Sequence, residues 1–121
     1  MNYKQFTSYI ADYKDIGSAE RLLGEIGFPP DICLTADGLV TAVHIIAAVA
    51  ENDVKSLVEM SGLSMARFAG KYTIPYRTVQ DWCAGTRTPA EYIALLIGWE
   101  MISELPTEEG ITEESIDATQ A

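Results

Sequence analysis

The stretch that decides the fold is residues 63–82, LSMARFAGKYTIPYRTVQDW, which predicts two short helices joined by a tight turn. Ser64 is a favourable N-cap for an eight-residue first helix, and Ala69 is small enough to allow a close helix crossing. Pro75 cannot continue the first helix because it lacks a backbone N–H, but it fits the first turn of a second helix. The pattern therefore predicts a helix-turn-helix with residues 72–75 in the turn.

The second helix of this pair, residues 75–84, has one narrow apolar stripe. Val79 and Trp82 lie three residues apart and share the face that we expect to be buried. A short helix with a polar outer face suits insertion into the major groove of DNA. The outward positions are Tyr76, Arg77, Gln80 and Asp81.

A longer stretch, LSMARFAGKYTIPYRTVQDWCAGTRTPAEYIALLI, resembles the phage-repressor (Cro-like, XRE) helix-turn-helix family over about residues 53–102. The shared features are Ala69 at the helix crossing, the IPYRTV opening of the second helix, the inward Trp82, and Gly85 followed by Thr-x-x-Glu. Nothing comparable covers residues 1–52. The resemblance implies a lambda-repressor-like helical bundle that binds double-stranded DNA.

The resemblance also implies which side chains would contact DNA. Tyr76, Arg77 and Asp81 would face base edges, with Gln80 beside them. Arginine can pair with guanine O6 and N7, and aspartate can accept a hydrogen bond from cytosine N4. The alternative is that these are solvated polar residues on a bundle surface. The implied phosphate contacts are Thr78, Lys55, Arg67, Lys71 and Arg87.

Three positions depart from the family pattern. Met65 stands where the family often has a glutamine that touches DNA, and Cys83 stands where a glutamate commonly follows the tryptophan. Thr73 occupies the turn position that is usually glycine. If the backbone there has a positive φ, threonine is energetically costly.

The distribution of charge separates this region from the rest of the chain. The chain of 121 residues carries a net charge of −10, which by itself opposes binding to phosphates. Residues 55–90 hold five basic and two acidic residues, net +3, whereas the remainder holds three basic and sixteen acidic residues, net −13. This asymmetry is expected of a nucleic-acid face on an acidic body, although it can also arise by chance.

The rest of the chain also has helical patterns, so the predicted fold class is all-α, with about six or seven helices. Residues 37–51 are apolar on nearly all sides, which is typical of a helix at the centre of a protein. The last helix has a start signal, in which Thr88 is the cap, Pro89 takes the first position and Glu91 completes a capping box. The further helices are predicted over residues 3–14, 18–26, 37–51, 53–61 and 89–104.

These elements predict three regions. Residues 1–52 form an N-terminal helical extension that packs on the core, with a loop at 28–36, and residues 53–105 form the DNA-binding domain. Residues 106–121 carry five acidic and no basic residues and form an acidic tail, which we expect to be disordered. A lone helix-turn-helix offers few base contacts, so we also expect a homodimer built with residues 1–50 or the helix at 89–104.

Other function classes have less support in the sequence. A protein-binding module on the same fold (an antitoxin, an inhibitor or a DNA mimic) is the alternative favoured by the net charge and by Met65. The single histidine, His44, has no partner at metal spacing, and there is no phosphate-binding loop or catalytic constellation, so we expect no enzyme, cofactor or metal. Cys33 and Cys83 match no metal or redox spacing. With no apolar run of about 18 residues and no signal peptide, the expected location is the cytoplasm, away from membranes.

Overall fold

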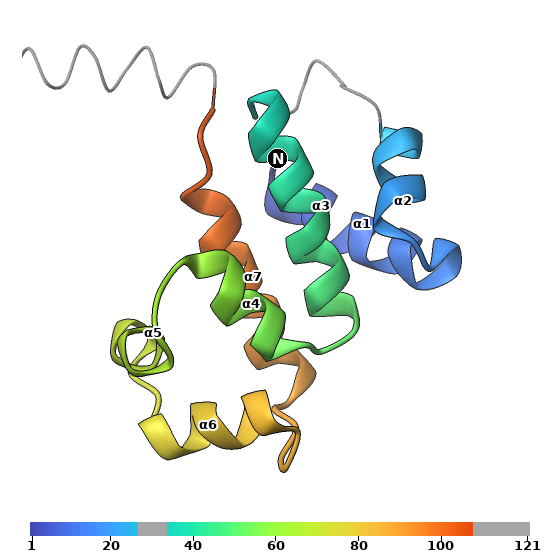
Figure 1. Ribbon diagram of the computed structural model, residues 1–121. Coiled ribbons are helices and arrows are strands. Elements are labelled where there is room, and N and C mark those ends of the chain that lie inside the picture. Colours follow the sequence, from blue (N-terminus) through green and yellow to red (C-terminus); the bar gives the residue numbers. More distant parts are fainter. Residues whose placement is uncertain (27–33, 108–121) are drawn as a thin grey trace, which may run out of the picture.

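The computed structural model describes residues 1–26 and 34–107, and over those ranges the chain folds into helices (Figure 1). The expected all-α class is confirmed, since the only extended pairing in the described ranges is an isolated bridge between Leu34 and Thr107. None of the described helices is long and apolar enough to cross a membrane. The helices are α1 (Tyr3–Ile16), α2 (Ala19–Ile26), α3 (Ala36–Ala50), α4 (Val54–Ser61), α5 (Met65–Tyr72), α6 (Tyr76–Ala84) and α7 (Glu91–Ser103).

Helix α3 lies at the centre, as its apolar sequence predicts. The side chain of Thr35 caps its first turn by accepting a hydrogen bond from the Gly38 N–H at 3.0 Å. Apolar side chains on almost every side of α3 are buried, because α1, α2, α4 and α7 all pack around it. Figure 1 shows α3 running through the middle of the molecule, with α1 and α2 on one side and α4 and α7 on the other. His44 lies on the exposed strip that remains.

Helices α3 and α7 pack closely at Gly98. A Cβ atom added there would lie 2.3 Å from Cγ2 of Val49 and 3.3 Å from Cγ2 of Ile45, so no larger residue fits without movement. Phe6 of α1 is fully buried beside this crossing, and its ring centroid lies 5.5 Å from that of Trp99. One hydrophobic cluster therefore contains residues from α1 through α7.

The start of α7 differs from the prediction. Thr88 does not cap the helix, and Pro89 is not its first residue, because the chain is still extended at Ala90 (φ −61, ψ 145) and the helix begins at Glu91. Pro89 is buried, and its carbonyl oxygen accepts a hydrogen bond from the Asn52 side-chain amide at 2.8 Å. This long-range contact fixes the segment before the helix, and a local capping pattern does not reveal it.

The first two residues of the expected tail, Pro106 and Thr107, contact the segment before α3. The backbone N–H of Thr35 donates to the carbonyl oxygen of Pro106 at 3.2 Å, next to the Leu34–Thr107 bridge. Residues 108–121, which make up the rest of the predicted acidic tail, lie outside the described residues, as do most of the predicted loop at 28–36 and Cys33.

Candidate nucleic-acid interface

Helix α5 begins where its sequence predicts but includes Tyr72, which was expected in the turn. The Ser64 hydroxyl oxygen accepts a hydrogen bond from the Arg67 N–H at 3.2 Å, which satisfies one of the otherwise unpaired donors of the first turn. Phe68 and Ala69 are buried on the inner face. The helix ends at Tyr72, and Thr73 follows in the left-handed conformation, with φ 56 and ψ 44. The expected cost of a β-branched residue at this position is therefore present.

A short connection links α5 to α6. The Ile74 N–H returns to the Ala69 carbonyl at 2.9 Å, and this bond turns the chain sharply after α5. Helix α6 begins at Tyr76, one residue later than predicted, so Pro75 is its N-cap and not its first residue. The Pro75 carbonyl oxygen accepts hydrogen bonds from the backbone N–H groups of Thr78 and Val79. Figure 1 shows α5 viewed along its axis and α6 viewed along its length, so the two helices cross steeply.

Helix α6 has one buried residue and a polar outer face. Val79 is fully buried, while Tyr76 and Arg77 are exposed, and Thr78 and Gln80 are half-buried. Trp82 was expected in the core but is only half-buried. It packs against the edge of the core and lines an apolar groove that α6 shares with α7.

Asp81 joins two of the implied DNA-contacting arginines. Its Oδ1 atom lies 3.4 Å from Nε of Arg77, and its Oδ2 atom lies 3.8 Å from Nε of Arg87. The Asp81 carbonyl oxygen also accepts the backbone N–H groups of Thr86 and Arg87, so the chain folds back over the end of α6. This fold-back brings Arg87, which follows α6 in the sequence, to the same face as Arg77.

Lys71 points toward α7. Its Nζ atom lies 2.6 Å from Oε1 of Glu104 and 3.2 Å from Oε1 of Glu100. The hydrogen bond to Glu104 raises the pKa of Lys71, so the ammonium group stays charged and paired. The Tyr72 hydroxyl donates to the other oxygen of Glu100 at 3.2 Å. The sequence places Lys71 among the phosphate contacts, but the structure gives it two carboxylate partners.

The remaining implied contacts lie on separate elements. Lys55 is exposed on α4 and Arg67 is exposed near the start of α5. Met65 does not reach outward as a hydrogen-bonding residue would, because it is half-buried against the core. Burial raises the pKa of the free Cys83 thiol on α6, and nearby Lys55 opposes that shift.

Comparisons with protein-family models, with curated proteins and with solved structures find no match to this chain. Among the described residues, no group of three or more His, Cys, Asp or Glu side chains is arranged to hold a metal ion. The DNA-binding expectation therefore depends on the geometry and charge of α5, α6 and the segment that follows them.

Proposed function

We propose that this protein is a sequence-specific DNA-binding regulator, a small transcriptional regulator of bacterial, phage or mobile-element type. Helices α5 and α6 act as its helix-turn-helix, and α6 enters the major groove. The observation that carries this proposal is the position of Arg77 in the first turn of α6. Its side chain is 84% exposed, on a helix whose inner face is held by the fully buried Val79. A guanidinium at that position can reach a guanine edge.

The local charge supports contact with DNA despite the acidic chain. Arg67, Arg77 and Arg87 are all exposed on α5, α6 and the segment after α6, and Asp81 offsets one of these charges. Affinity would then depend strongly on salt, because each phosphate neutralised releases counterions. The acidic remainder of the chain disfavours non-specific binding and leaves more of the selectivity to the α6 contacts.

A dimer fits this proposal and has a candidate surface. On α7, Tyr92 is 64% exposed and Leu96 is 57% exposed, whereas five other residues of that helix are buried. These two residues lie four positions apart and so share one face of the helix. To bind two half-sites one turn of DNA apart, two copies joined there or through the N-terminal helices need their α6 helices about 34 Å apart.

The test is selection of bound sequences from a pool of random duplexes at low salt. The regulator proposal expects one enriched motif from the folded protein, and loss of that enrichment in Arg77→Ala. Arg21→Ala is the matched control, because Arg21 is an exposed arginine on α2, outside the proposed interface. Circular dichroism establishes that each variant is helical. Failure of the folded wild-type protein to enrich any sequence would refute DNA recognition.

A protein-binding module is the second candidate. Two features favour it: the net charge of −10, and the pairing of Lys71 with two glutamates instead of its being left for phosphate. This alternative expects no enriched duplex and a stoichiometric complex with a partner protein that survives Arg77→Ala.

A further inference from the structure

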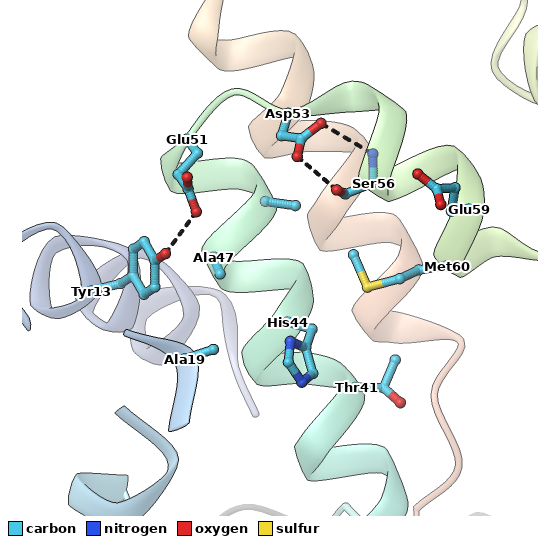
Figure 2. A pocket seen from close by; sticks show the side chains of 11 residues that line it. Tyr13, Ala19, Thr41, His44, Ala47, Glu51, Asp53, Ser56, Glu59 and Met60 are labelled. Carbon is cyan, nitrogen blue, oxygen red and sulfur yellow. Dashed lines mark hydrogen bonds between the residues drawn. The ribbon is translucent and has the colours of Figure 1, made fainter. Parts of the chain in front are cut away.

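A groove lies between α3, α4 and the facing parts of α1 and α2 (Figure 2). Its volume of about 530 Å³ is within the usual range for small-molecule sites. Tyr13 and Ala19 form one wall, the middle of α3 forms the floor, and α4 forms the other wall. The groove therefore joins the N-terminal helices to the first helix of the region that resembles a repressor.

The charged groups that line this groove all have the same sign. Glu51, Asp53 and Glu59 contribute carboxylates, and within residues 1–26 and 34–107 no lysine or arginine lines the groove. His44 is at the centre of the view in Figure 2, between the two walls. The carboxylates come from the end of α3, the cap of α4 and the body of α4, and they lie along one end of the groove (Figure 2).

Two of these carboxylates are fixed in place. The Tyr13 hydroxyl donates to Oε2 of Glu51 at 2.6 Å, and this bond raises the pKa of Tyr13 to about 12, so the hydroxyl stays protonated at neutral pH. Asp53 accepts the backbone N–H and the hydroxyl of Ser56, at 3.1 Å and 2.6 Å. Hydrogen bonds from neutral groups thus hold the carboxylates of Glu51 and Asp53 in position, and these bonds do not neutralise their charge.

Apart from the polar side chains of Thr41, His44 and Ser56, the rest of the lining is apolar or aromatic. Ala47 and Ala48 leave the floor open, and the thioether of Met60 faces them from α4. The Tyr13 ring adds an aromatic wall beside Glu51. Carboxylates together with an aromatic ring and an apolar floor match a ligand with a positive head and an apolar body, because the ring face and the acids both attract a cation.

We propose that this groove binds an organic cation: an ammonium or guanidinium group carried on an apolar chain. The occupant comes from outside this chain, since residues 108–121 hold five acidic and no basic residues and are repelled by the same carboxylates. The cation has two available sources, a free amine or a basic side chain of a peptide. The site does not depend on DNA binding, because it shares none of the implied DNA contacts.

The test is isothermal titration of the full chain at matched ionic strength. One arm uses butylamine, a cation at neutral pH, with neutral butanol as the comparison, and the other uses a capped alanine pentapeptide with one central arginine. We expect saturable one-to-one binding in at least one cationic arm and none with butanol. Butylamine binding identifies a free amine as sufficient, and binding of the peptide alone identifies a basic side chain in a chain context.

Variants distinguish a site from general attraction to an acidic protein. Glu51→Gln combined with Glu59→Gln should weaken binding by about tenfold or more, equivalent to about 1.4 kcal/mol. Asp12→Asn removes an exposed carboxylate of α1 that does not line the groove, and should leave affinity unchanged. If the double variant fails to fold, Glu59→Gln alone is the test, because Glu59 is exposed and its substitution should not disturb the fold. Equal binding by all variants, or absence of saturation in both cationic arms, overturns the proposal.

Discussion

Arg77 and Asp81 form an ion pair one helical turn apart on α6, with Nε and Oδ1 3.4 Å apart. The Asp81 side chain is only 19% exposed, whereas the side chains of Arg77 and Arg87 are 84% and 76% exposed. The carboxylate therefore directs its two oxygens at the arginines, and two guanidinium groups, one from α6 and one from the segment that follows it, are exposed beside it. Through these pairs Asp81 acts as a positioning residue for both arginines.

The first prediction concerns Arg77. In Arg77→Ala, the protein should lose about 1–3 kcal/mol of affinity for its preferred duplex and discriminate less at one base position, because a bidentate contact with guanine is removed. Competition binding with single-base variants of the selected motif measures both effects. Uniform weakening over all sequences would place Arg77 on a phosphate instead of a base.

The second prediction concerns Asp81. Asp81→Asn removes a negative charge and loosens Arg77 and Arg87, so we expect stronger binding to unrelated duplexes and a salt slope steeper by about one. Discrimination should fall, because the two guanidinium groups are no longer held in position. The measurement is affinity for a specific and an unrelated duplex at several salt concentrations. If discrimination is lost only at a cytosine while non-specific affinity is unchanged, Asp81 reads that base directly.

Much of this arrangement is predictable because its causes are local. Ser64 caps α5 through a bond to a residue three positions away, and Thr73 takes a positive φ at the turn position that the resemblance identifies. The apolar composition of residues 37–51 predicts a central helix without knowledge of its partners. In each case, the neighbouring residues in the sequence contain the information.

The features that sequence reasoning missed depend on residues far apart in the chain. Lys71 meets Glu104, which lies 33 positions later, so its pairing cannot be read from the α5 pattern. The start of α7 depends on Asn52, which lies 37 positions before Pro89. The groove of Figure 2 is likewise made by α1, α2, α3 and α4 together, and no motif in any one of these helices indicates it.

Gly98 gives a prediction about packing. Gly98→Ala should destabilise the fold by about 1–3 kcal/mol, because the new methyl group overlaps Val49 at the α3–α7 crossing. Gly70→Ala on α5 is the matched control. A Cβ there meets nothing within 4 Å, so alanine should stabilise the helix by about 0.5–1 kcal/mol. Urea unfolding measures both. If both substitutions changed the free energy of unfolding by the same amount in the same direction, the close crossing of α3 and α7 at Gly98 would be contradicted.

Thr73 gives a prediction about backbone strain. A left-handed non-glycine residue costs about 1–2 kcal/mol, and the greater flexibility of unfolded glycine offsets about 0.5–1 kcal/mol of that, so Thr73→Gly should stabilise the protein by about 0.5–1 kcal/mol. Gly62→Ala tests the reverse change, since Gly62 also has a positive φ of 73 and open space around its Cα atom. Gly62→Ala should therefore lower the free energy of unfolding. Thermal unfolding measures both variants, and a destabilised Thr73→Gly would show that the threonine side chain contributes more than its strain costs.

The last prediction separates Lys71 from the other basic residues. Because Glu100 and Glu104 already pair with its ammonium group, Lys71→Ala should change the salt slope of DNA binding by clearly less than one, whereas loss of a phosphate contact lowers the slope by about one. The ion pairs are partly exposed, so the free energy of unfolding should fall by no more than about 1 kcal/mol.

Arg67→Ala is the matched comparison on the same helix, because Arg67 is exposed and implied to contact phosphate. Binding measured between 50 and 200 mM salt, the range over which phosphate contacts change affinity strongly, compares the two variants. If Lys71→Ala lowers the salt slope by a full unit, DNA draws the lysine away from its two glutamates. In that case Glu104→Gln should strengthen DNA binding, because it weakens the competing ion pair.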